Sequence, residues 1–253
     1  MYTFEHPATT QTGALTDYRY IGANPNNYVY FNGDELWRII GVFTVDVGNG
    51  NTEQRIKIVR NEKLSSNMKW DSNNVNEWPT ATLNTYLNGD YYNGLDATSK
   101  SMISDTKYYL GGSSVYDNLK GEDYYNFERG TTVYSGRSTS WNGKIALMYP
   151  SDYSYTYALG VDNTCYTDGY GCDGSSRKTN GWIFNTNSNS TQWLLSPRSG
   201  SSLGAFYLFD SGNVTASNRV TDSYGVRPSL YLVSSIKIDS GDGSQQSPYI
   251  LKL

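Results

Sequence analysis

Hydrophobic and polar residues alternate most clearly early in the chain. The segment YVYFNGDELWRIIGVF, Tyr28–Phe43, has two apolar runs on either side of Asn32-Gly33, a preferred two-residue hairpin turn. The next run, Arg55–Glu62, alternates Ile56 and Ile58 with other residues. We therefore predict a β-hairpin followed by a third strand.

A first helix is predicted after the Trp-Pro pair at 78–79. Leu83, Tyr86 and Leu87 recur at helical spacing, and Thr80 precedes them as a candidate N-cap.

A second helix is predicted to begin near Asp96 and to carry Met102 and Ile103 inward. No later segment has helical spacing, and residues 108–140 are expected to form ordered loops rich in Tyr and Gly.

The second half of the chain predicts short strands. A buried strand is expected at Ile145–Met148, and a polar excursion follows over residues 154–192. Further strands are expected near Trp193, in a hairpin that turns at Ser211-Gly212, and near Val226. The tail, SIKIDSGDGSQQSPYIL, predicts one more pair of strands around a DGS turn.

Together these elements indicate an α+β fold of antiparallel strands with two early helices and long ordered loops. We expect one domain over residues 20–253, preceded by a flexible N-terminal extension at residues 1–19.

The composition restricts the function. The 253 residues include 20 basic and 24 acidic side chains, a net charge of −4, and 17% are charged. Because phosphate recognition needs a basic stripe, we expect no nucleic-acid partner. Aromatic residues, at 15%, are enough for a large core, which argues against disorder. No run of about 18 apolar residues occurs, so we expect no direct membrane insertion.

Two features bear on cellular location. The start, MYTFEHPATTQTG, lacks the basic and apolar regions of a signal peptide, so the chain is either intracellular or a mature ectodomain. Cys165 and Cys172 lie in a polar Gly/Tyr loop, where a local disulfide is favoured and free surface thiols are the alternative. A disulfide places the protein outside the cytosol.

Known catalytic motifs are missing. His6 is the single histidine, which argues against Ser-His-Asp and Cys-His hydrolases. Two cysteines and one distant histidine do not make a zinc site, and no phosphate-binding glycine motif occurs. We therefore expect no catalytic residue, no metal and no cofactor.

Carboxylates leave two weaker alternatives open. A glycosidase pair could form among several acidic residues that otherwise are solvated loop charges: Asp71, Glu77, Asp117, Glu122, Asp123 and Asp152. The segment Asp239–Ser244 has the spacing of part of a calcium loop, but it lacks the later ligands and predicts a turn.

Three segments of the C-terminal third resemble one protein family. WLLSP (Trp193–Pro197), AFYLFDSGNV (Ala205–Val214) and YGVRPSLYL (Tyr224–Leu232) are similar to the C-type-lectin-fold variable proteins of bacterial and phage diversity-generating retroelements. The earlier segments YVYFNGDELWRIIGVF, WPTATLNTYLNGDYYN and GKIALMYPSDY, with the tail SGDGSQQSPYIL, look like the framework of a surface-protein branch. The resemblance covers most of residues 20–253.

The resemblance implies a C-type-lectin-like fold and a binding function without catalysis. In such proteins adenine-directed mutagenesis rewrites codons near the C-terminus, and the altered side chains form a ligand-binding face on a constant scaffold. The implied location is extracellular, on a bacterial cell surface or a phage particle. The implied partner is an unidentified protein or glycan.

The implied coding restriction can be checked in the sequence. Mutation of the adenines in AAC or AAT codons never yields Lys, Glu, Gln, Met or Trp. None of these five types occurs in the 43 residues Leu194–Ile236, and the next longest such gap, Tyr149–Arg177, has 29. The candidate variable region is therefore 194–236.

Within this region some residues look like framework, and others are candidate ligand-binding positions. The framework residues are Trp193–Pro197, Ser211-Gly212, Val214 and Gly225–Pro228. The candidates are Arg198, Ser199, Ser201, Ser202, Leu203, Tyr207, Phe209, Asp210, Asn213, Ala216, Asn218, Arg219, Thr221, Asp222 and Tyr224. Tyrosine offers a large contact area with few rotatable bonds, and Ser, Gly and Asn offer adaptable hydrogen bonding, as in antibody loops.

A structural role is the alternative at several positions. Tyr207 and Phe209 share one side of a strand, which is more typical of a core than of a binding site. Arg227 is expected to be a buried structural arginine. We expect the tryptophans to be core residues: Trp37, Trp70, Trp78, Trp141, Trp182 and Trp193.

Three other functions compete with binding by a variable face. Formylglycine-generating enzymes share the broad fold and a related Gly-x-Arg ending, but their redox cysteines lie near a C-terminal groove, unlike Cys165 and Cys172. A calcium-dependent sugar lectin would carry EPN or QPD followed by WND, which are missing here. A structural pilus or virion subunit is the third alternative.

Overall fold

The computed structural model describes residues 1–116, 119–157, 181–184 and 191–253. Over these residues the chain is a strand-rich α+β protein with short helices. The two cysteines, Asp117 and most of the polar excursion lie outside the described residues, so the disulfide prediction stays a prediction.

The main sheet contains seven strands among the described residues, in the order β1-β2-β4-β5-β14-β9, with β3 also pairing with β4. All its pairs are antiparallel. Its strands are β1 (Tyr2–His6), β2 (Leu15–Arg19), β3 (Tyr28–Tyr30), β4 (Leu36–Gly48), β5 (Asn51–Arg60), β9 (Ile145–Ala146) and β14 (Ser229–Tyr231). Because β14 lies between β5 and β9, the C-terminal part of the chain completes a sheet that the N-terminal part begins.

The early hairpin is confirmed. β3 and β4 pair from Tyr28↔Arg38 to Tyr30↔Leu36. Asn32 and Gly33 have φ of 60° and 73°, a left-handed conformation that Asn and Gly adopt most easily. The predicted third strand corresponds to β5, which pairs along most of β4.

The prediction of a flexible extension at residues 1–19 is wrong. β1 and β2 form a hairpin at the edge of the main sheet, and β2 pairs with β4. His6, which a mobile terminus would expose, is 4% exposed, and its Nε2 lies 3.2 Å from Oδ2 of Asp17. The inward side chains of this hairpin are charged, so hydropathy alternation did not reveal it.

Both early helices are confirmed, with one correction. α1 (Thr82–Tyr86) continues through the π-helical turn η2 (Leu87–Tyr91) into α2 (Tyr92–Gly94), and α3 (Ala97–Met102) follows. Thr80 does not cap α1, because it belongs to the 3₁₀ turn η1 (Trp78–Thr80) and Ala81 holds the cap position. Asp96 caps α3 by accepting a hydrogen bond from the Ser99 N–H at 2.9 Å.

The prediction of loops over residues 108–140 is wrong in part. The segment contains α4 (Gly121–Glu128), and β7 (Thr106–Tyr109) pairs with β8 (Ser140–Gly143) at its borders. A further helix, α5 (Pro150–Ser154), follows β9. α4 buries Tyr124, Tyr125 and Glu128, so its inward face contains no aliphatic residue of the kind on which helical spacing is usually recognised.

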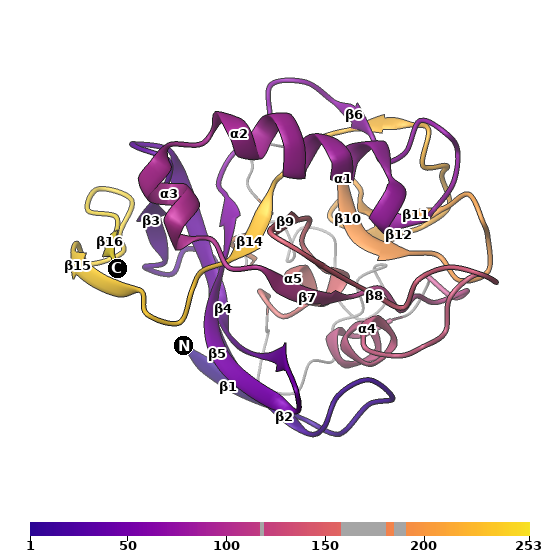
Figure 1. The fold of residues 1–253 in the computed structure, drawn as a ribbon, viewed down its shortest axis with the longest axis horizontal. Helices are drawn as coiled ribbons and strands as arrows, with labels where there is room; N and C mark the ends of the chain where they lie inside the picture. The colour runs from indigo at the N-terminus through magenta and orange to yellow at the C-terminus, as the bar shows by residue number, and fades with distance from the viewer. Residues whose placement is uncertain (117–118, 158–180, 185–190) are drawn as a thin grey trace.

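The C-terminal strands agree with the prediction. β10 (Gln192–Pro197), β11 (Ala205–Leu208) and β12 (Val214–Thr215) form a three-stranded sheet, in which β11 and β12 turn through Ser211-Gly212. Two-stranded pairs form between β13 (Ser223–Tyr224) and β6 (Met68–Lys69), and between β15 (Lys237–Ser240) and β16 (Ile250–Lys252). In Figure 1 helices α1 to α3 lie along one side of β4 and β5, and the strands β10 to β12 lie beyond α1.

The core contains most of the residues expected there. Trp37, Trp70, Trp78, Trp182 and Trp193 are at most 4% exposed, whereas Trp141 is half-buried. Arg227 is confirmed as a buried structural arginine: it is 2% exposed, its Nε donates to the Arg60 carbonyl at 2.9 Å, and its Nη1 donates to the Ile183 carbonyl at 2.8 Å.

Two carboxylates that were expected to be solvated are buried. Asp71 accepts hydrogen bonds from the N–H groups of Asn73, Val75 and Thr82, and so fixes a loop. Asp152 belongs to a buried ion pair with Lys57. Neither carboxylate faces a second one across a solvent cleft.

Candidate functional site

The candidate residues lie at both ends of the hairpin formed by β10 and β11. These strands pair from Gln192↔Leu208 to Pro197↔Ala205, so the loop after β10 and the turn after β11 are at opposite ends. The five residues of chain from Gly204 to Phe209 span roughly 16 Å when extended. The candidates therefore form two separate groups.

One buried side chain, Asn76, holds the loop Arg198–Leu203. Its Nδ2 lies 3.0, 2.8 and 2.9 Å from the carbonyl oxygens of Arg198, Ser201 and Gly204. Its backbone N–H donates to the carbonyl of Ser202 at 3.0 Å. Because the loop makes these contacts through its backbone, the contacts with Asn76 do not depend on the identity of the loop side chains.

A second segment, Asn218–Asp222, lies against this loop. Gly204 and Arg219 form a β-bridge, and the N–H of Val220 donates to the carbonyl of Leu203 at 2.8 Å. Asp222 closes a tight turn, because its Oδ2 accepts from the Arg219 N–H at 3.1 Å. We call the loop Arg198–Leu203, the segment Asn218–Asp222 and Tyr224 together the C-terminal surface.

The side chains of this surface are accessible in part. Arg219 is exposed, and the other candidates on the surface are half-buried: Arg198, Ser199, Ser201, Ser202, Leu203, Asn218, Thr221, Asp222 and Tyr224. Asn76 and main-chain bonds hold much of this backbone, and two candidate side chains, Ser201 and Asp222, also accept hydrogen bonds from it.

Two candidates belong to the core. Tyr207 is 2% exposed and Ala216 is fully buried, so neither side chain faces solvent. Tyr207 is therefore a core residue, which was the alternative to a ligand-binding role. Phe209 does not share this buried side of the strand, because it is 43% exposed.

The three remaining candidates form the second group, at the turn between β11 and β12. Phe209 and Asp210 are exposed and Asn213 is half-buried. The N–H of Phe209 donates to the carbonyl of Asn213 at 2.7 Å, and the hydroxyl of Tyr153 donates to the carbonyl of Gly212 at 2.8 Å. α5 thus supports this turn, far from the C-terminal surface.

A cluster of three aromatic rings underlies the C-terminal surface. The ring centroids of Trp193 and Tyr224 are 4.6 Å apart, and those of Tyr207 and Tyr224 are 5.2 Å apart. Trp193 Nε1 donates to the carbonyl of Met68, and the Tyr224 hydroxyl accepts from Nδ2 of Asn218. Burial raises the pKa of both tyrosine hydroxyls, so they stay neutral and act as hydrogen-bonding groups.

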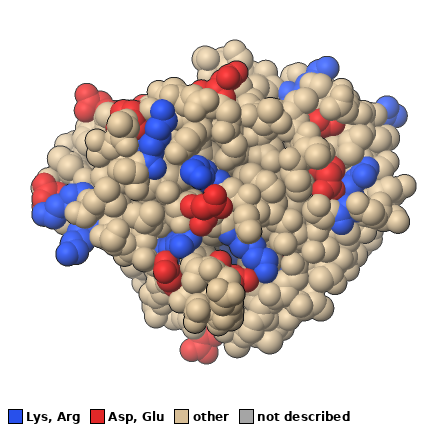
Figure 2. Space-filling view, viewed as in Figure 1, with Lys and Arg blue, Asp and Glu red and all other residues tan. Residues whose placement is uncertain are grey.

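Charge on the C-terminal surface is sparse. The guanidinium of Arg198 lies 4.6 Å from the ring centre of Tyr116, a cation–π distance. Arg219 extends into solvent, and Asp222 is the single acidic residue of the surface. On the face drawn in Figure 2, acidic and basic side chains are interspersed among wide uncharged areas.

Several residues that position this surface were missed in the sequence. Asn76 holds the loop, Ser113 accepts from the N–H of Ser199 at 3.1 Å, and Tyr116 supports Arg198. They lie more than 75 residues before the candidate region, and no local pattern links them to it. Gly200 packs against Ser114, where a Cβ would meet the Ser114 Cβ at 2.8 Å.

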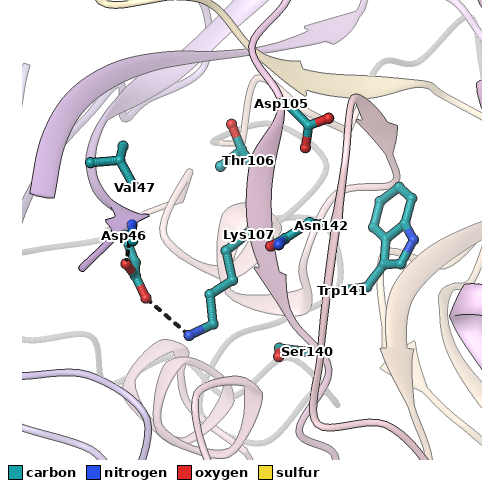
Figure 3. A pocket seen from close by; sticks show the side chains of 9 residues that line it. Asp46, Val47, Asp105, Thr106, Lys107, Ser140, Trp141 and Asn142 are labelled. Carbon is teal, nitrogen blue, oxygen red and sulfur yellow. Dashed lines mark hydrogen bonds and ion pairs between the residues drawn. The ribbon is translucent and has the colours of Figure 1, made fainter. Parts of the chain in front are cut away.

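The cavities of the described structure lie elsewhere. One of about 410 Å³ lies between the β4–β5 turn and the β7–β8 pair, lined by residues such as Asp46, Asp105, Lys107 and Trp141. In Figure 3 Asp46 and Lys107 point toward one another at 2.9 Å, while Trp141 lies to one side. None of the described candidates lines this cavity or two others of about 520 and 280 Å³.

Among the described residues, no group of three or more His, Cys, Asp or Glu side chains is arranged to hold a metal ion. No helix in the described part of the chain is long and apolar enough to cross a membrane.

Comparison with family models, with curated proteins and with solved structures finds no match to this chain.

Proposed function

We propose that the protein is a non-enzymatic ligand-binding protein with a C-type-lectin-like fold, displayed outside the cell on a bacterial surface or a phage particle. The C-terminal surface binds a protein or glycan ligand. Adenine-directed mutagenesis by a retroelement diversifies the side chains of this surface.

One observation carries the proposal: much of the backbone of the C-terminal surface is held by Asn76, which lies outside the candidate variable region, and by main-chain bonds. Asn76 donates to three loop carbonyls, and Gly204 and Val220 join the two segments through main-chain contacts. Half-exposed side chains can then change at little cost in folding free energy, which is what a variable binding face requires.

The side chains suit binding as well. Tyr224 belongs to the packed aromatic cluster and is partly exposed. The surface also contains two arginines, Arg198 and Arg219, and arginine is a residue type that often contributes most of the binding energy at an interface. The surface lies in the 43-residue stretch without Lys, Glu, Gln, Met or Trp.

Binding can be tested without knowing the ligand. The purified chain is screened on a glycan array and against whole bacteria and their surface extracts, and each positive signal is measured again with the triple variant R198A/R219A/Y224A. We expect the triple variant to reduce each specific signal by tenfold or more. The matched control is F209A/D210A, which removes exposed side chains from the opposite end of β11 and should leave binding unchanged.

Diversification is tested separately, by sequencing the source locus. We expect a reverse-transcriptase gene and a second copy of the codons for residues 194–236 that differs at adenines. A locus with neither would refute diversification but not binding, whereas equal loss of binding in the control variant would refute the assigned surface. Loss of binding on chelation would point instead to a calcium-dependent lectin.

A further inference from the structure

A buried cluster of charged residues lies outside the C-terminal surface. β1 and β2 contribute His6, Asp17 and Arg19, β5 contributes Lys57, and α5 contributes Asp152. The side chains of this cluster are at most 2% exposed. Binding by the C-terminal surface does not use them.

The closest pair in the cluster is Lys57 and Asp152. Nζ of Lys57 lies 2.5 Å from Oδ2 of Asp152, across 95 residues of chain. Their side chains are 0% and 1% exposed. A second Lys–Asp pair of almost the same length, Lys252 and Asp239 at 2.6 Å, has side chains 55% and 49% exposed, so burial is what distinguishes the first pair.

Aromatic rings enclose the Lys57 amine. Nζ lies 4.3 Å from the ring centre of Tyr149, 5.1 Å from that of Tyr231 and 5.8 Å from that of Phe43. Burial lowers the pKa of Lys57, which increases the share of the neutral, nucleophilic amine. The charges of Asp152 and Glu128 oppose this lowering of the Lys57 pKa, whereas the charge of Arg129 adds to it.

The carboxyl group of Asp152 is held in a fixed orientation. Oδ1 faces Nη1 of Arg19 at 3.4 Å, and Oδ2 accepts from the N–H of Tyr149 at 2.9 Å and faces Lys57. A guanidinium at Oδ1 can stabilise negative charge that develops on this oxygen when a nucleophile attacks Cγ. The amine is already in van der Waals range of the carboxyl group, so little motion is needed.

We propose that Lys57 and Asp152 condense into an intramolecular amide, a covalent cross-link between β5 and α5. The C–N bond forms between Nζ of Lys57 and Cγ of Asp152, and the bond from Cγ to Oδ2 breaks. The ammonium loses two protons to Oδ2, which leaves as water, and one proton remains on the amide nitrogen. Charge and atoms balance and no electron is transferred, so the reaction needs no oxidant, metal or cofactor.

Exclusion of water favours the product. In bulk water, hydrolysis of the amide is favoured over its formation. Here the side chains of Lys57 and Asp152 are both shielded from solvent. Folding also holds the amine and the carboxyl group together at an effective concentration far above that of any free amine. The product also removes two buried charges, whose desolvation is costly.

Intact mass spectrometry of the denatured wild-type chain tests the proposal. We expect a mass lower than that of the sequence by one water molecule. After trypsin digestion, cleavage after Lys57 should be blocked, and the peptide Ile56–Arg60 should appear joined to Ile145–Arg177. The peptide Ile238–Lys252, which contains the exposed pair, serves as the internal control and should keep its full mass.

Two variants distinguish the cross-link from an ion pair. K57R keeps the charge and D152A removes the carboxyl group, and both should have the full mass of their sequences. On a denaturing gel the wild-type chain, closed into a 95-residue loop, should migrate faster than either variant. If the wild-type chain has its full mass and Ile56–Lys57 is recovered unlinked, the proposal is wrong, whether or not the variants fold.

Discussion

At the scale of single residues, Asn76 supports the candidate site most directly. Its buried amide lies within hydrogen-bond distance of three carbonyls, and Asn76→Ala removes this donor; the Gly204 carbonyl still accepts from the Arg198 N–H. We predict a loss of about 1–3 kcal/mol in the free energy of unfolding, measured by urea titration. The exposed neighbour Asn73 is the matched control, and Asn73→Ala should change stability by less than about 0.5 kcal/mol.

Tyr207 and Phe209 have opposite roles although they are two residues apart. Tyr207 is packed against Trp193 and Tyr224, whereas Phe209 is 43% exposed. We predict that Tyr207→Ala costs about 3–5 kcal/mol, because it opens a cavity in the core. Phe209→Ala should cost less than about 1 kcal/mol. Thermal unfolding of both variants measures the difference, and similar losses would mean that Phe209 is also packed.

At the scale of elements, Glu128 joins α4 to α5. Its Oε1 accepts from the Ser151 N–H at 2.8 Å and its Oε2 from the Ser151 hydroxyl at 2.5 Å. Burial raises the pKa of Glu128 from 4.5 to about 7; Asp152 adds to the rise, and Arg129 and Ser151 oppose it.

This rise predicts a pH dependence of stability with a definite sign. Between pH 4.5 and about 7 the folded chain binds more protons at Glu128 than the unfolded chain, so this contribution to stability is complete below pH 4.5 and is lost as the pH rises through about 7. We predict that, relative to the variant E128Q, the wild-type chain loses about 3 kcal/mol across this window.

Denaturant titrations at intervals from pH 4 to 8 measure the difference. His6 contributes in the opposite direction, because burial lowers its pKa below 6.5, but its contribution is common to both chains and cancels. Glu122→Gln, on the exposed side of α4, is the control and should have the wild-type slope. Parallel curves for E128Q and the wild-type chain would contradict the prediction.

The sequence predicted elements best where their signals are local. The hairpin turn at Asn32-Gly33, the helix start at Asp96 and the strands β10, β11, β12 and β14 were predicted, because turn residues, caps and apolar runs act over a few positions. The helix α4 was missed because its inward residues, Tyr124, Tyr125 and Glu128, are not aliphatic.

The parts that the sequence did not predict depend on distant partners. β1 and β2 have charged inward residues whose partners include Asp152 and the rings of Tyr125 and Tyr155, all distant in the sequence. Asn76 and Tyr116 support the C-terminal surface from far along the chain. Composition predicted a surface with few charges and many aromatic residues. It did not predict that Phe209 and Tyr224 lie in two separate groups, because that separation follows from the register of β10 and β11, which only the folded chain defines.

At the scale of the whole molecule, the N-terminal half of the chain and β14 of the C-terminal part share one sheet. β14 pairs with β5, and Ser229 and Leu230 contact β9 on its other side. The buried hydrophobic residues of the described chain form one core cluster, with members from Val29 to Leu232. The C-terminal surface therefore lies on a scaffold that is stabilised by residues from the full length of the described chain.

The N-terminal hairpin tests this view of a single scaffold. Removal of residues 1–13 deletes β1, with the Phe4–Tyr155 contact and the His6 ring stacked 3.5 Å from that of Tyr125. Asp17 then loses its histidine partner and becomes accessible to solvent. We predict a loss of roughly 3 kcal/mol or more in stability, with one cooperative transition retained because the remaining core is continuous. Calorimetry measures both quantities. An unchanged melting temperature would mean that residues 1–13 are a peripheral extension, as the sequence alone suggested.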